Sequence, residues 1–206
     1  MNLFRKYMYQ FVETLKLKDG IICNPDYHQS RMNRTLEELF PGAESIELMG
    51  AITIPENCRA GLYKIRVIYN RSIEKIEIEP YQLRSIQSLK VVHHESVDYH
   101  LKYTDRQVLQ ELYAQRGTCD DVLIIKNGFV SDSYTANVLF FDGNTWVTPT
   151  TPLLRGTKRQ FFLDEGMIFE KEIRGKNISG YQKVGLINAL IDFEEMPVIP
   201  VEKIFY

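Results

Sequence analysis

The chain has 206 residues, a net charge of −2 at pH 7 and 44% apolar residues. This apolar share and nearly balanced charge are typical of folded globular proteins. Nucleic-acid binding requires a basic excess, so this charge argues against nucleic acid as the main partner. No apolar run reaches bilayer length and the N-terminus lacks the apolar core of a signal peptide, so we expect a cytoplasmic protein with no membrane partner.

The three cysteines, Cys23, Cys58 and Cys119, lie far apart in the sequence. Their spacing contains no pair of the kind that binds zinc, so we predict no metal site. An odd number of separate thiols is typical of reduced cysteines in a cytoplasmic protein.

The first part of the chain predicts a strand, a return strand that starts at Ile21-Ile22-Cys23, and a helix. Residues 7–17 alternate in part and read as a strand, which turns at Lys18-Asp19-Gly20. A helix is expected from about Tyr27 to Phe40, because Met32, Leu36 and Leu39 recur at helical spacing. Pro41-Gly42 then ends it.

Antiparallel strands follow. Residues 62–70 and 73–80 alternate between apolar and polar side chains and are joined by a short turn, which predicts a hairpin. We expect residues 85–94 to add a third antiparallel strand. Strands covered by a helix predict a small α/β sandwich over residues 1–100.

The second half predicts mostly strands with two or three helices. Thr104 and Gln107 have the spacing of a capping box, so a helix should begin there. Asn127-Gly128 and Asp142-Gly143 each predict a hairpin turn. A further helix is expected over residues 156–165. These elements form a second domain over residues 101–206.

Two basic residues are candidates for chemistry. Lys102 lies between Leu101 and Tyr103 near the junction of the halves, and a lysine in a partly apolar pocket can have a lowered pKa and attack an aldehyde. Arg31, in the predicted first helix, has the planar fork of donors that suits phosphate. A surface lysine and a solvated basic helix face are the simpler alternatives, and spacing alone favours them.

Three further features could bind an anionic cofactor or its substrate. A helix start at Gly156, Thr157 and Lys158 offers N–H groups and a positive dipole end to a phosphate. A carboxylate such as Asp132 can keep a pyridine nitrogen protonated. Arg66, on a strand, could bind a substrate carboxylate. An ordinary helix start, an Asp in its own turn and a cross-strand ion pair explain each feature equally well.

Taken in order, these features and the residues between them form one dense pattern: Asp132, Asn137, Val138-Leu139-Phe140, Asp142-Gly143, Thr148-Pro149 and Leu154-Arg155-Gly156-Thr157-Lys158-Arg159. The pattern resembles the signature of the class IV aminotransferases, which are the fold-type IV pyridoxal-phosphate enzymes. The opening FVETLKLKDG, the His-x-x-Arg of the first helix and the strand LYKIRVIY are also similar to that family.

The resemblance implies a two-domain α/β (α+β) fold of type IV. Residues 1–100 would form the N-terminal α/β sandwich, and residues 101–206 a mostly β pseudo-barrel domain with helices that binds the cofactor. The implied cofactor is pyridoxal 5'-phosphate (PLP), and the implied assembly is a homodimer.

The resemblance also assigns roles to residues. Lys102 would hold PLP as a Schiff base and move the substrate's α-proton. Arg31 would bind the phosphate, together with the backbone of Gly156, Thr157 and Lys158. Asp132 would face the pyridine nitrogen.

Four more positions follow from the same resemblance. Asn137 belongs to the cofactor signature and would itself bind the cofactor. Asn188 and Ala189 would add N–H groups near the phosphate and the substrate. Arg66 would bind the substrate carboxylate. The chain departs from the family in having Asp132 where Glu is usual, in having Thr157 where Ile or Val is usual, and in its short length.

The closing segment INALIDFEEMPVIP resembles that of the 4-amino-4-deoxychorismate lyases, which serve folate biosynthesis. We therefore expect a PLP-dependent enzyme that eliminates pyruvate from a small aminochorismate-type substrate and leaves 4-aminobenzoate. An amino-acid transaminase, of the branched-chain or D-amino acid type, is the alternative. A non-catalytic dimeric scaffold is a second alternative.

Overall fold

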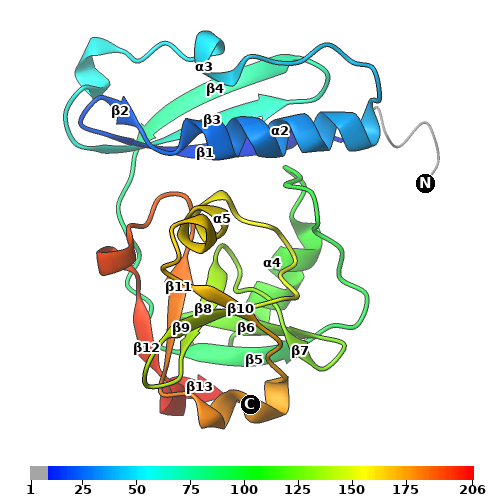
Figure 1. Ribbon diagram of the computed structural model, residues 1–206, viewed down its shortest axis with the longest axis vertical. Coiled ribbons are helices and arrows are strands. Elements are labelled where there is room, and N and C mark those ends of the chain that lie inside the picture. The colour runs from blue at the N-terminus through cyan, green and yellow to red at the C-terminus, as the bar shows by residue number, and fades with distance from the viewer. Residues whose placement is uncertain (1–8) are drawn as a thin grey trace. The chain divides into compact units, whose positions relative to one another are not determined.

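The computed structural model describes residues 9–206, which fall into two compact units (Figure 1). The first unit contains the described chain up to Leu83 together with Leu101–Asp105. The second contains Arg84–His100 and Arg106–Tyr206. The chain therefore enters the second unit at Arg84, returns to the first for five residues, and leaves it again at Arg106. A domain boundary at residue 100 stays a prediction.

The first unit is built on an antiparallel sheet with the strand order β2-β1-β3-β4. Its elements are β1 (Phe11–Lys18), β2 (Ile21–Ile22), β3 (Leu62–Tyr69), β4 (Ile73–Pro80), the helices α2 (Pro25–Leu39) and α3 (Leu48–Ala51), and the short helix η1 (Glu56–Cys58). The tight β1–β2 turn is possible because Asp19 and Gly20 both adopt positive φ angles, of 49° and 81°. The turn expected at Lys18-Asp19-Gly20 and the hairpin of residues 62–70 and 73–80 are confirmed. The strand expected over residues 7–17 is present as β1, and residues 7 and 8 lie outside those that the structure describes.

The core of the first unit lies between α2 and one face of this sheet. Ile65, Val67 and Tyr69 of β3 are buried, whereas the alternate residues of that strand are only partly covered. Met32 and Leu36 of α2 belong to the same core cluster. The face expected from helical spacing is therefore confirmed, and so is the alternation of residues 62–70.

Residues 101–105 are attached to the edge of β1. The backbone N–H of Val12 donates to the carbonyl of Lys102 (3.0 Å), and the N–H of Thr104 donates to that of Gln10 (2.9 Å). The hydroxyl of Thr104 also donates to the Gln10 carbonyl. The expected capping box is therefore wrong: α4 (Gln107–Ala114) begins after Arg106 and has no side-chain cap.

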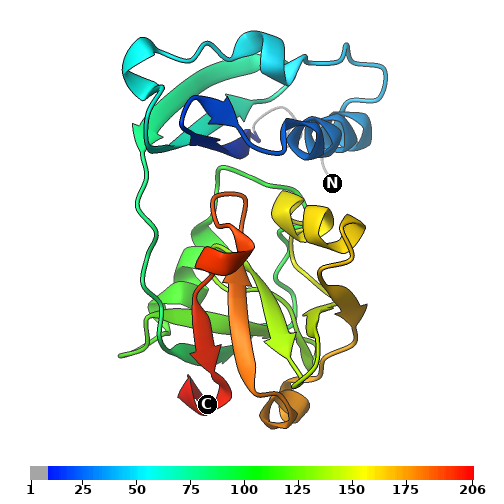
Figure 2. The same cartoon turned by 60° about the vertical axis from the view of Figure 1, so that its left-hand side comes forward.

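The second unit contains two sheets (Figure 2). One has the order β10-β9-β8-β11-β12, with β8 (Asn137–Phe141), β9 (Trp146–Pro149), β10 (Phe169–Lys171), β11 (Lys183–Ile187) and β12 (Val198–Pro200). The other has the order β13-β5-β6-β7, with β5 (Leu89–His93), β6 (Asp121–Lys126), β7 (Phe129–Val130) and β13 (Ile204–Phe205). Its helices besides α4 are α5 (Thr157–Asp164) and the short η2 (Gly175–Gly180), η3 (Phe193–Glu195) and η4 (Val201–Lys203).

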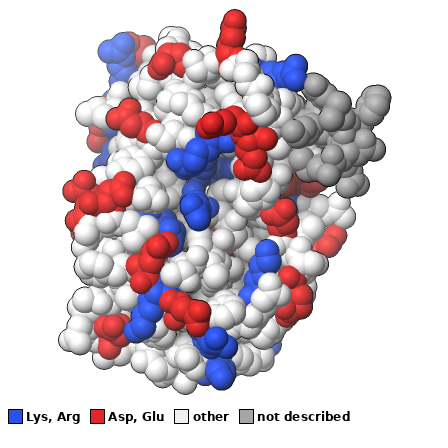
Figure 3. Space-filling model, turned by 45° about the vertical axis from the view of Figure 1, so that its right-hand side comes forward, with Lys and Arg blue, Asp and Glu red and all other residues white. Residues whose placement is uncertain are grey.

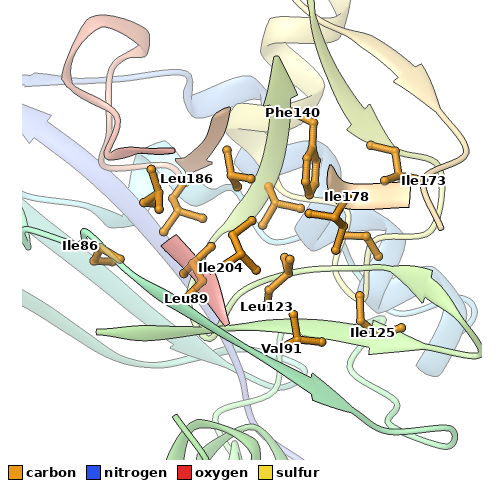
Figure 4. Packing of buried hydrophobic residues seen from close by; sticks show 14 of the residues in the cluster. Ile86, Leu89, Val91, Leu123, Ile125, Phe140, Ile173, Ile178, Leu186 and Ile204 are labelled. Carbon is orange, nitrogen blue, oxygen red and sulfur yellow. The ribbon is translucent and has the colours of Figure 1, made fainter. Parts of the chain in front are cut away.

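Side chains from both sheets meet in the core of the second unit (Figure 4). Leu89 and Leu123 come from one sheet, and Phe140 and Leu186 from the other. Each of these four side chains is almost completely buried. Mixed sheets with few helices confirm the α/β (α+β) class expected from the sequence.

The strand expected at residues 85–94 is present but was assigned wrongly. β5 belongs to the second unit, and it pairs in parallel with β6 and β13 rather than antiparallel in the first unit. Leu89, Val91 and Val92 are all buried, so both faces of β5 are covered, as is usual for parallel strands. An apolar run predicts such a strand but carries no information about its direction.

Acidic and basic side chains are interspersed over the face shown in Figure 3, in keeping with the small net charge. Within residues 9–206, no helix has both the length and the apolar character that crossing a bilayer requires.

Candidate active site

A buried cluster in the first unit surrounds Glu13 of β1. The Nε of Arg31 donates to Oε1 of Glu13 (2.9 Å) and its Nη2 donates to Oε2 (2.5 Å). Nδ1 of His28 lies 2.6 Å from the same Oε2. His28 and Arg31 lie one turn apart on α2, so one helix face brings both to the strand.

The cluster fixes the charge of its members. Burial by itself would raise the pKa of Glu13, but the charge of Arg31 and the hydrogen bonds from His28 and Arg31 outweigh it and lower the pKa to about 2. Burial lowers the pKa of His28, and the charges of Arg31 and Lys102 lower it further against the opposing effect of Glu13. His28 is therefore neutral at pH 7, and its Nδ1–H donates to the carboxylate.

Lys102 lies in the same unit as Arg31, and both act on the pKa of His28. The backbone of Lys102 is held beside β1 by the bond from Val12, next to Glu13 in sequence. Its side chain is partly buried. The lysine and the arginine singled out from the sequence are therefore brought to one cluster.

Arg66 lies on the other face of the sheet. It is in register with Thr14 of β1, whereas Glu13 is in register with Val67. Its Nη1 donates to the carboxylate of Glu77 (2.7 Å), which is the cross-strand ion pair expected as the alternative. Its assignment to a substrate carboxylate stays a prediction. Lys16, fully buried on the same face as Arg66, was not singled out from the sequence.

In the second unit, Asp132 is buried and held at both oxygens. Nδ2 of Asn137 donates to Oδ1 (2.7 Å), and the backbone N–H of Leu154 donates to Oδ2 (3.0 Å). The same Nδ2 also donates to the carbonyl of Leu154 (2.8 Å). The acid is therefore tied both to the start of β8 and to the turn that follows β9.

Burial raises the pKa of Asp132 to about 6, although the backbone of Leu154, the amide of Asn137, the backbone of Leu153 and the charge of Arg159 oppose the rise. The surroundings thus stabilise the carboxylate only in part. A cation placed against this acid would favour its charged form. A protonated pyridine nitrogen is such a cation, so the Asp132 carboxylate fits the ring nitrogen of the cofactor.

The loop that carries Asp132 is anchored through Tyr134. The N–H of Tyr134 donates to Oδ1 of Asp121 (3.2 Å), and its carbonyl accepts a hydrogen bond from Nη2 of Arg106. The ring of Tyr134 contacts both the guanidinium of Arg106, 4.4 Å from its centroid, and the ring of Tyr113, with 4.3 Å between the ring centroids. None of these supports was singled out from the sequence as part of the site.

The start of α5 lies next to the acid. Gly156 is the residue that precedes the helix, and a Cβ built on it would lie 2.0 Å from Oδ1 of Asn137. Thr157 is the first helical residue and is buried. The first N–H groups of this eight-residue helix have no side-chain cap. The helix start expected at Gly156 and Thr157 is therefore present beside Asp132.

The side chain of Lys158 is buried and faces Asp192, with Nζ 3.4 Å from the carboxylate. Its proposed contribution to a phosphate would therefore come from the backbone alone. Arg159 is also buried, and it donates to the hydroxyl of Thr148, to the carbonyl of Pro149 and to the carboxylate of Glu170. This last basic residue of the signature thus joins α5 to β9 and β10.

Asn188 and Ala189 follow β11, whose last residue, Ile187, is in register with Asn137. The side chain of Asn188 accepts from the N–H of Leu190 (2.9 Å) and lies 3.4 Å from the carbonyl of Thr135. The second unit therefore brings together the acid, Asn137, the start of α5 and this turn.

Known proteins match most of the chain. The family model for amino-transferase class IV matches residues 10–204. A Haemophilus influenzae protein of uncharacterized function is 37% identical over 185 residues, which span 89% of this chain and 98% of the relative.

Solved structures match as well. The structure of a candidate 4-amino-4-deoxychorismate lyase from Haemophilus somnus 129PT is similar, with 32% identity, 89% of this chain and 97% of that chain covered, and a TM-score of 0.85. The branched-chain amino acid aminotransferase of Escherichia coli shares the fold, with a TM-score of 0.72 at 16% identity, covering 99% of this chain and 79% of that one. These matches confirm the fold of type IV and the PLP dependence expected from the sequence: the chain belongs to the class IV aminotransferase family.

Proposed function

We propose that this protein is a PLP-dependent 4-amino-4-deoxychorismate lyase, which eliminates pyruvate from aminodeoxychorismate and leaves 4-aminobenzoate. The observation that carries the proposal is the likeness to the Haemophilus somnus candidate lyase over nearly the full length of both chains. The closing Asn188-Ala189-Leu190 segment, which lies beside the acid loop, is a second support.

When bound, PLP supplies an electron sink for the negative charge that develops on the substrate's α-carbon. Lys102 would hold the cofactor through its Nζ, and the same Nζ would move the α-proton of the substrate. The backbone of Lys102 is held beside β1, in the unit that also contains Arg31. Arg31 binds the phosphate with a guanidinium that Glu13 holds in a fixed plane.

The second unit supplies most of the other contacts in this proposal, and the first unit adds Arg66. Asp132 keeps the ring nitrogen protonated, and the N–H groups at Gly156 and Thr157 bind the phosphate at a positive helix end. The turn at Asn188 and Ala189 adds backbone N–H groups. Arg66 binds a substrate carboxylate, which requires it to exchange its ion pair with Glu77. A homodimer completes the proposed assembly.

The second candidate function is amino-acid transamination, which uses the same first steps and then passes the amino group to a keto acid. The fold shared with the Escherichia coli branched-chain enzyme favours it, though that likeness concerns the fold alone. A non-catalytic dimeric relative is the third candidate, motivated by Asp132 in place of the usual Glu.

One set of assays separates these candidates. PLP-loaded protein is given aminodeoxychorismate, and released pyruvate and 4-aminobenzoate are measured. In parallel, it is given branched-chain or D-amino acids with 2-oxoglutarate, and glutamate is measured. Equal amounts of pyruvate and 4-aminobenzoate support the lyase. Glutamate formation without pyruvate release favours the transaminase, and protein that stays colourless with added PLP favours the scaffold.

A further inference from the structure

We infer that Asn137 is a positioning residue that couples Asp132 to the turn before α5. Through Asn137, the acid for the ring nitrogen and the helix start for the phosphate are held in a fixed relation to each other. The inference rests on the proposed cofactor site. It also changes the role of Asn137 from a direct cofactor ligand to a residue that acts through Asp132.

The hydrogen bonds of Asn137 link Asp132 to the turn at Leu154. Its amide nitrogen has two protons. One is donated to Asp132 (2.7 Å) and the other to the carbonyl of Leu154 (2.8 Å). The N–H of Leu154 then donates back to the second oxygen of Asp132 (3.0 Å), which closes a ring of three hydrogen bonds. Both protons are used within the protein, so this nitrogen has none left for a cofactor.

The amide of Asn137 also packs closely against Gly156, the residue before α5. A Cβ at Gly156 would lie 2.0 Å from Oδ1 and 3.2 Å from Cγ of Asn137, so any larger residue must displace that amide. The backbone of Gly156 has φ −67° and ψ 143°, which every residue can adopt. The close approach of Asn137, and not the backbone conformation, is therefore what requires a glycine here.

Asp132 is sensitive to this arrangement because few groups stabilise its charge. The backbone of Leu154, the amide of Asn137 and the backbone of Leu153 oppose the effect of burial more than the charge of Arg159 does. Displacing Asn137 removes one donor to the carboxylate and loosens its link to the turn. The charged acid that a ring nitrogen needs is then formed only at higher pH.

A double-mutant cycle tests the coupling. Gly156→Ala, Asn137→Ala and the double variant are compared with wild type in the full-length protein. Gly180→Ala is the control, because a Cβ built there meets no atom of residues 9–206 within 4 Å apart from its chain neighbours. The PLP dissociation constant is measured by equilibrium dialysis from pH 5 to 9. Free PLP titrates identically in every sample, so a difference between variants in the pH midpoint of binding comes from the protein.

Each single variant should weaken PLP binding by about tenfold or more and move the pH midpoint of binding upward. The double variant should bind like Asn137→Ala alone, because removing the amide removes the clash, and Gly180→Ala should match wild type. If Asn137→Ala does not fold, Asn137→Ser takes its place in the cycle. Full additivity, or an unchanged midpoint in the Asn137 variant, overturns the inference and leaves the proposed function intact. Wild-type protein that takes up no PLP overturns both.

Discussion

The guanidinium of Arg31 forms a fork-to-fork pair with the carboxylate of Glu13, with its Nε and Nη2 each donating to a different oxygen. Both side chains are more than 90% buried. A planar pair of this kind fixes the orientation of the guanidinium as well as its charge. Glu13 thereby positions the arginine that we propose for the phosphate.

Replacing the acid should therefore destabilise the protein. Glu13→Gln leaves the buried charge of Arg31 without its partner, and we expect a loss of about 3–5 kcal/mol in the free energy of unfolding. Urea unfolding at pH 7 measures it. Glu44→Gln, at an exposed position, is the control and should change stability by less than about 0.5 kcal/mol. A similar stability for both variants would show that the buried pair contributes little.

The same pair predicts a dependence of stability on pH. The pKa of Glu13 is lowered from 4.5 to about 2, so its contribution is fully present above pH 4.5 and is lost as the pH falls through 4.5 toward 2. A shift of that size corresponds to about 3 kcal/mol. The stability difference between wild type and Glu13→Gln, measured by urea unfolding at pH 7, 4.5 and 3, should shrink below pH 4.5. A difference that stays constant to pH 3 would contradict the lowered pKa.

Lys102→Ala should abolish turnover and the visible absorption of lysine-bound cofactor, because no other group is proposed to bind the aldehyde. The segment should stay in place, since the bond from Val12 goes to the carbonyl of residue 102 and not to its side chain. Absorbance with added PLP and circular dichroism check both points. The exposed Lys176→Ala is the control and should keep colour and activity. Activity of Lys102→Ala close to wild type would refute the assignment.

Arg31→Lys should weaken PLP binding by about tenfold or more, because an ammonium cannot pair with Glu13 and a phosphate through one planar fork. Equilibrium dialysis measures the affinity. The neighbouring Arg34→Ala, at an exposed position of α2, is the control and should leave the affinity unchanged. If both variants bind PLP like wild type, Arg31 is not the phosphate ligand.

Periodicity was enough to predict β3, β4 and α2 of the first unit, but not the short helices α3 and η1. The alternation of β3 and the helical spacing of Met32 and Leu36 reflect burial on one face, and burial is what a local pattern records. The predicted antiparallel pairing of β5 is wrong because its partners β6 and β13 are far away in sequence. The capping box failed for a similar reason, since Thr104 donates to Gln10 across the sheet edge.

Contacts between residues far apart in sequence could not be predicted at the candidate site either. A resemblance pointed to Arg31, Lys102 and Asp132, but no spacing shows that Glu13 is the partner of Arg31 or that Asn137 bridges Asp132 to a turn seventeen residues later. These contacts arise only when strand, helix and turn have packed. The Asp132 assignment itself stays a prediction until cofactor binding is measured.

The return of residues 101–105 to the first unit has a consequence for dissecting the protein. A gene fragment ending at Leu83 would encode the antiparallel sheet and α2 but would lack Lys102, and a fragment ending at Asp105 would carry β5 without the strands it pairs with. No single cut yields both units whole. Exchange of one unit between homologues by recombination would therefore need three crossovers, one on each side of Arg84–His100 and one after Asp105.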